Sequence, residues 1–143
     1  MSSKYIEGML EIPVGEGCEL KLAPITVSKS VSATTLVEKM IEENVGAVVV
    51  VEEGRPIGII TETDLLDKVI KPLKDLNVTL AEDIMSEPVI SLEFDRPMKE
   101  AIELLRKHNI KRVVVTKDST FLGLVTERRF LEITFLGLKS PVS

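Results

Sequence analysis

The sequence has few residues of the kinds that build disulfide frameworks, metal centres and aromatic surfaces. Cys18 and His108 are the only residues of their types among 143, tryptophan is absent and aromatic residues make up 3%. A single cysteine excludes an intramolecular disulfide framework and fits a reducing compartment. Neither a His/Cys metal site nor a Cys–His dyad has partners in the sequence, so an enzyme is the poorest of the function classes.

Long apolar runs and a positive charge balance are also missing. No apolar run approaches the roughly 18 residues of a membrane span, and the N-terminus lacks the basic-then-apolar order of a signal peptide. We therefore expect a cytoplasmic protein. The net charge of −5 argues against a general electrostatic grip on nucleic acid, but it does not exclude a local basic cluster.

What the sequence does contain is an internal repeat. Residues 58–64 (GIITETD) return as residues 123–129 (GLVTERR), a register of 65 that also pairs Asn44 with Asn109. No insertion is needed from about residue 25 to residue 66. A repeat without gaps predicts two copies of one supersecondary unit, packed so that equivalent surfaces face each other.

Each copy predicts the element order β-α-β-β-α. Ser30 and Asp95 are the expected N-caps of the first helices, and Thr61 and Thr126 stand where the second helices should begin. The first 20 residues lie outside the repeat and are predicted to form an added strand or a mobile arm. The apolar tail from Thr134 is expected to extend the last helix onto a partner. The expected extended and strand segments are residues 24–27, 48–51, 57–60, 88–92, 113–115 and 121–125.

The two units resemble the cystathionine β-synthase (CBS) domain pair. Residues 44–50 (NVGAVVV) and 58–64 resemble its first domain, and residues 83–91 (DIMSEPVIS) and 108–112 (HNIKR) resemble its second. The resemblance covers roughly residues 20–137. It implies an α+β fold of two units related by pseudo-two-fold symmetry: an N-terminal arm (1–20), CBS domain 1 with a connector (21–78) and CBS domain 2 with a C-terminal tail (79–143).

The resemblance also implies a function. CBS pairs are typically regulatory modules without a catalytic cofactor; they bind adenosine-containing ligands in the clefts between the two domains, and two pairs often assemble into a flat disc. We therefore expect a non-enzymatic, nucleotide-sensing homodimer that signals to another protein by conformational change. The alternative is a scaffolding or nucleic-acid-binding protein that uses the same fold without a small ligand. The regulated partner and the orientation of the two chains stay open.

The sharpest chemical difference between the copies is Asp64 against Arg129. A helix that starts at Thr61 favours an anion at its free backbone N–H groups, and the Asp64 carboxylate can accept both hydroxyls of a ribose. Alternatively, Thr61-x-x-Asp64 is a capping box in which the carboxylate merely returns to the Thr61 N–H. Copy two favours the ribose role, because Arg129 shows that the helix does not need a carboxylate.

Arg129 cannot accept a hydrogen bond, so the second cleft is expected to be vacant or altered; alternatively Arg129 is a solvated helix residue. The basic pair Lys111 and Arg112 favours AMP, ADP or ATP, with AMP preferred, over the cationic S-adenosylmethionine, unless the two are ordinary exposed charges. By resemblance, the ligand-binding cleft comprises Thr61, Thr63, Asp64, Val89, Ile90, Ile110, Lys111, Arg112 and Arg128. The second cleft comprises Ile25, Thr26, Gly46, Ala47, Thr126 and Arg129.

Overall fold

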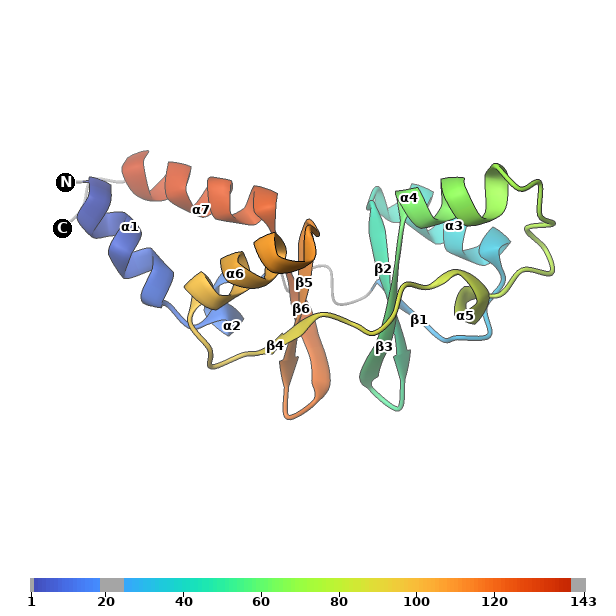
Figure 1. The fold of residues 1–143 in the computed structure, drawn as a ribbon, viewed down its shortest axis with the longest axis horizontal. Coiled ribbons are helices and arrows are strands. Elements are labelled where there is room, and N and C mark those ends of the chain that lie inside the picture. Colours follow the sequence, from blue (N-terminus) through green and yellow to red (C-terminus); the bar gives the residue numbers. More distant parts are fainter. Residues whose placement is uncertain (1, 19–24, 140–143) are drawn as a thin grey trace. The chain divides into compact units, whose positions relative to one another are not determined.

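The computed structural model describes residues 2–18 and 25–139, which form two compact units (Figure 1). The β1–β3 unit spans residues 25–89, and the β4–β6 unit combines residues 2–18 with residues 90–139. The β1–β3 unit contains β1 (Thr26–Val27), α3 (Ala33–Glu43), β2 (Ala47–Glu52), β3 (Arg55–Thr61), α4 (Glu62–Leu65), the π-helical turn η2 (Leu66–Ile70) and α5 (Ala81–Ile84). The β4–β6 unit contains α1 (Ser2–Glu11), α2 (Val14–Gly17), β4 (Ser91–Glu93), α6 (Met98–His108), β5 (Arg112–Lys117), β6 (Thr120–Thr126) and α7 (Glu127–Lys139).

Both units contain a three-stranded sheet with the same topology. β1 runs parallel to β2, which pairs antiparallel with β3, and β4, β5 and β6 repeat this arrangement. A β-bulge interrupts both hairpins at equivalent places, between Val50 and Val51 and between Val115 and Thr116. The centres of the middle strands, residues 48–50 and 113–115, are at most 1% exposed, as expected for β-branched runs covered on both faces. The predicted α+β fold and the β-α-β-β-α order are confirmed.

The predicted N-caps of the first helices are wrong by two residues. α3 begins after Ser32, whose hydroxyl accepts a hydrogen bond from the Thr35 N–H (3.2 Å), and α6 begins after Pro97. Proline suits a helix start because its fixed φ matches the cap and it has no N–H to leave unsatisfied. Both helices end at the repeated asparagine, Asn44 or Asn109, in the left-handed conformation (φ 53° and 50°), which asparagine tolerates better than most residues.

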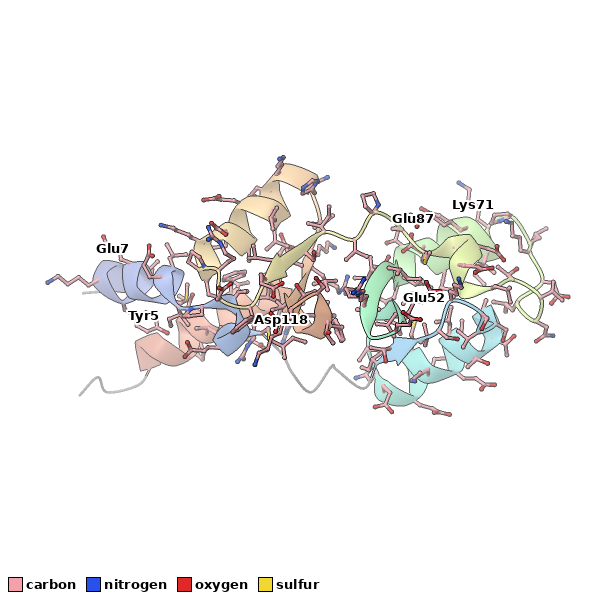
Figure 2. All side chains as sticks on the ribbon, turned by 90° about the horizontal axis from the view of Figure 1, so that it is seen from below. Tyr5, Glu7, Glu52, Lys71, Glu87 and Asp118 are labelled. Carbon is pink, nitrogen blue, oxygen red and sulfur yellow. The ribbon has the colours of Figure 1, made fainter. Side chains whose placement is uncertain are left out.

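The N-terminal segment is part of the β4–β6 unit. Its described residues form helices α1 and α2, where the sequence predicts an added strand or a mobile arm. α1 packs against α6 and α7 (Figure 1), and the Tyr5 hydroxyl on α1 donates a hydrogen bond to the Ile133 carbonyl on α7 (2.8 Å, Figure 2). Met9, Val14 and Cys18 lie in the core of this unit, beside Met98 and Phe130.

Residues 12–18 take the same place in the β4–β6 unit that residues 79–85 take in the β1–β3 unit. The two segments are 67 residues apart in the sequence, so they fall outside the register of 65. Each therefore closes the unit that does not follow it in the chain, and the compact units divide the chain differently from the repeat. The recurring backbone hydrogen bonds, from donor to acceptor, are Val14 to Arg96 (2.7 Å) and Ala81 to Val31 (2.9 Å), Gly15 to Phe94 (2.9 Å) and Glu82 to Lys29 (2.9 Å), and Met98 to Ile12 (2.8 Å) and Ala33 to Thr79 (2.8 Å).

Candidate ligand-binding site

Asp64 closes a capping box at the start of α4. Its Oδ2 accepts hydrogen bonds from the Thr61 backbone N–H (2.9 Å) and the Thr61 hydroxyl (3.2 Å). The same hydroxyl accepts from the Asp64 N–H (3.3 Å). Such a reciprocal pair satisfies two of the N–H groups that a helix leaves free at its start. The capping interpretation of Asp64 is therefore confirmed as geometry, and its binding of a ribose stays a prediction.

The other carboxylate oxygen of Asp64 is also occupied. Oδ1 accepts a hydrogen bond from the Ser86 hydroxyl (3.0 Å) and lies 3.0 Å from the Lys68 ammonium nitrogen. Burial, which leaves Asp64 8% exposed, acts to raise the pKa of its carboxyl. The Thr61 N–H, Lys68 and Ser86 outweigh burial and hold the pKa below its ordinary value. Asp64 is therefore a carboxylate at neutral pH.

The backbone around Asp64 offers an anion fewer donors than the sequence predicts. The Glu62 N–H donates to the Gly46 carbonyl (3.1 Å), and the N–H groups of Thr61 and Asp64 serve the capping box. α4 itself is only four residues long before the chain continues as η2. The expectation that the helix start binds an anion is therefore wrong for these three N–H groups, and any negative ligand group needs side-chain cations instead.

Arg129 holds the N-terminal segment rather than a ligand site. Its backbone N–H donates to the Thr126 hydroxyl (3.0 Å), so half of the capping box survives. Its guanidinium Nε donates to the Gly17 carbonyl at the end of α2 (3.0 Å). A cation is favourable there because the last carbonyls of a helix lack backbone partners. The alternative that Arg129 is a solvated helix residue is therefore wrong.

The remaining predicted residues gather around the same features within each unit. Gly46 and Ala47 lie beside Thr61, because β2 pairs with β3 there, and Lys111 and Arg112 lie beside Thr126 in the same way. In the β1–β3 unit the predicted set comprises Ile25, Thr26, Gly46, Ala47, Thr61, Thr63, Asp64 and Val89, and in the β4–β6 unit it comprises Ile90, Ile110, Lys111, Arg112, Thr126, Arg128 and Arg129. That Asp64 and Lys111 serve one ligand stays a prediction.

Sequence reasoning missed Lys68 and Ser86. Lys68 carried a weak signal, since it follows Asp64 by four residues on one helix, the spacing at which opposite charges meet. Ser86 carried none, because it is 22 residues from Asp64 in the chain. Within residues 2–18 and 25–139, no three His, Cys, Asp or Glu side chains gather as a metal site would require. Among the helices described, none has the length and apolar character needed to cross a bilayer.

Comparison with known proteins places the chain among CBS proteins. The sequence profile of the CBS domain matches residues 21–71 and 81–134. An uncharacterised protein of Methanopyrus kandleri is 38% identical over 127 residues, which cover 87% of this chain and 64% of that protein. The chain thus spans about two thirds of the length of this relative.

Solved structures share the fold. An uncharacterised conserved protein from Pyrococcus horikoshii superposes with a TM-score of 0.79 at 24% identity, covering 94% of this chain and 97% of that one. The hexameric CBS-CP12 protein from bloom-forming cyanobacteria superposes with a TM-score of 0.76 at 22% identity, covering 92% and 77%. At these identities the likeness shows the fold alone.

Proposed function

Because the chain belongs to the CBS domain family and carries two tandem copies of the domain, we propose that it is a regulatory module that binds an adenine nucleotide. The observation that carries the proposal is the ionised, largely buried carboxylate of Asp64, which stands at the Asp position of the first GIITETD repeat. A carboxylate can accept both hydroxyls of a ribose in charge-assisted hydrogen bonds. Arg129 at the equivalent position cannot, so one nucleotide per chain is expected.

Charge supports AMP, ADP or ATP as the ligand, with AMP preferred. Lys111 is exposed and Arg112 half-buried at the start of β5, while their counterparts in the other unit are the uncharged Gly46 and Ala47. A phosphate is stabilised by such a pair, whereas the sulfonium of S-adenosylmethionine is repelled. Bound nucleotide then shifts the protein between states that a partner protein distinguishes, to the extent that it binds those states with different affinity.

Isothermal titration with AMP, ADP, ATP and S-adenosylmethionine tests the proposal. We expect adenine nucleotides to bind near one per chain, and Asp64→Asn to weaken them by about 10- to 100-fold, the loss of about 1.5–3 kcal/mol from hydrogen bonds to a charged group. Asp67→Asn is the matched control, because Asp67 is an exposed carboxylate on the next turn. Equal affinity in both variants would refute the ribose assignment. No heat with any nucleotide would favour the scaffolding or nucleic-acid alternative.

We further propose that two chains associate as a homodimer through apolar side chains at repeat-equivalent positions. Leu66 and Leu131 occupy one such position, and Ile70 and Phe135 the other, with exposed fractions of 58%, 71%, 49% and 58%. Large apolar residues exposed in pairs one helical turn apart typically mark an interaction surface. That a similar structure is hexameric agrees with self-association.

Light scattering after size-exclusion chromatography tests the homodimer. The double variant Leu66→Glu with Leu131→Glu is expected to elute as a monomer, because a contact between copies would bury both charges without partners. Val78→Glu, also at an exposed apolar residue (70%) but outside these two helices, is expected to keep the mass of the unmodified protein. A monomeric unmodified protein, or an unchanged mass in the double variant, would contradict the proposal.

A further inference from the structure

We infer that Ser86 and Lys68 form an internal latch on Asp64, which an adenine nucleotide opens when its ribose binds there. The inference rests on the proposed function and names how that site is regulated. Both latch residues belong to the β1–β3 unit together with Asp64. Lys68 lies in η2, one turn beyond Asp64, and Ser86 follows α5 on the segment that leads towards β4.

The first step is a count of hydrogen bonds at the carboxylate. Two carboxylate oxygens offer about four acceptor positions. Oδ2 of Asp64 uses two on Thr61, and Oδ1 uses two on Ser86 (3.0 Å) and Lys68 (3.0 Å). No acceptor position is left for a ribose hydroxyl. A nucleotide that binds Asp64 therefore replaces at least one of the present donors.

The second step decides which donor leaves. Displacing the Thr61 N–H would leave a backbone donor of the helix start unsatisfied, which costs about 1–3 kcal/mol in a buried position. Ser86 is exposed, so its hydroxyl is rehydrated at little cost. The Lys68 ammonium, 41% exposed, keeps its hydrogen bond to the Ile84 carbonyl (2.9 Å) when it turns from Asp64. The ribose therefore enters on the Oδ1 side and displaces Ser86 first.

The third step follows the chain from Ser86. Its backbone forms two hydrogen bonds with Ile59 on β3, through the Ser86 N–H (2.8 Å) and the Ser86 carbonyl (3.2 Å). Beyond it, the exposed Glu87 (Figure 2) begins the stretch that runs into β4 of the other unit. The Ser86 hydroxyl is thus a side-chain anchor of the crossover segment, residues 84–90. Opening the latch loosens this segment, so that ligand binding at Asp64 reaches the chain that connects the two units.

The β4–β6 unit shows the same anchor without the carboxylate. Gly17 corresponds to Ile84 in the register of 67, and its carbonyl accepts from Arg129 as that of Ile84 accepts from Lys68. A cation on the second helix therefore fastens the preceding short helix in both units. Only in the β1–β3 unit does this cation also contact an acid that a ribose can claim, which assigns the ligand-operated latch to Asp64 alone.

Titration of Ser86→Ala with AMP tests the latch. Because the variant has no hydroxyl for the ribose to displace, its Kd for AMP is expected to fall about three- to tenfold, the factor that one hydrogen bond commands. Merely weakened packing would not tighten binding. Ser86→Thr, which retains the hydroxyl, and Ser30→Ala, at an exposed serine of the same unit, are expected to bind AMP as the unmodified protein does.

Amide hydrogen exchange supplies the second readout. In the unmodified protein, saturating AMP is expected to speed exchange of the Ser86 amide, whereas a latch that stays closed would slow it or leave it unchanged. An unaltered or raised Kd in Ser86→Ala would overturn the latch and leave nucleotide binding standing. If neither protein binds AMP, ADP or ATP, the proposed function falls and the latch falls with it.

Discussion

Deleting residues 1–18 is expected to unfold the β4–β6 unit. Met9, Val14 and Cys18 are each at most 6% exposed and pack among the buried residues of α6, β5 and α7. Their loss uncovers the core of the unit on one side. Replacing a single buried methionine by alanine already costs about 2–5 kcal/mol, and domains have only about 5–15 kcal/mol of unfolding free energy.

Backbone hydrogen bonds add to the loss. The Val14 and Gly15 N–H groups pair with the carbonyls of Arg96 and Phe94, and the Ile12 carbonyl accepts from the first N–H of α6 at Met98. Removing the segment leaves these groups without partners next to the core. Each of them then needs water where the fold otherwise excludes it, which makes truncation more damaging than any one side-chain change.

Thermal unfolding followed by circular dichroism, with hydrogen exchange resolved by residue, measures the effect. The truncated protein is expected to lose protection in β5 and β6, and Met9→Ala to lower the unfolding free energy by about 2–4 kcal/mol. Deleting residues 1–4 alone is the control, because it spares Tyr5 and the buried residues, and it should shift Tm by only a few degrees. Protected β5 and β6 amides in the longer truncation would show that the segment is dispensable.

The contribution of the N-terminal segment could not be predicted from the repeat. A gapless register of 65 locates strands, helices and capping threonines, since these follow local patterns that both copies keep. Residues 12–18 match residues 79–85 only at a register of 67 and with almost no identity; Val14 and Ala81 share little beyond complete burial. What the two segments have in common is backbone hydrogen bonding to the opposite copy, and a sequence pattern does not show that.

The candidate site divides in a similar way. The capping geometry of Thr61 and Asp64 is local and was available from the spacing of three residues. The occupation of the second carboxylate oxygen was not, because it depends on Ser86 being brought back to β3 by a bridge with Ile59. Arg129 was read as a missing acid, and its contact with Gly17, 112 residues away, depends on the same placement of the N-terminal segment.

Asp64→Asn is expected to destabilise the β1–β3 unit by about 1–3 kcal/mol at pH 7 and by much less at pH 3. The neutral amide loses the charge that strengthens the hydrogen bonds from Thr61 and Ser86. The ion pair with Lys68 adds little, because that ammonium is 41% exposed and screened by water. The unfolding free energy from urea titration, read from β1–β3 amides, measures the difference.

The pH dependence follows from the lowered pKa of Asp64. Because the folded pKa lies below the unfolded value of about 3.9, the stability that Asp64 contributes is fully present well above pH 4. It is lost as pH falls through the folded pKa, where the carboxylate takes up a proton in the folded state too. Glu93 and Glu100 also have lowered pKa values, but they lie in the β4–β6 unit, so amides of β1–β3 separate their effect.

Asp67→Asn should change the unfolding free energy by less than about 0.5 kcal/mol at both pH values. An Asp64→Asn deficit that is equally large at pH 3 would mean that shape, not charge, holds the capping box. A pH-dependent deficit together with unchanged AMP affinity would assign the carboxylate to the helix start alone. The same deficit with weakened AMP binding would mean that one carboxylate serves both the fold and the ligand. That is the condition under which a ribose can draw on the stability of the fold to open the Ser86 latch.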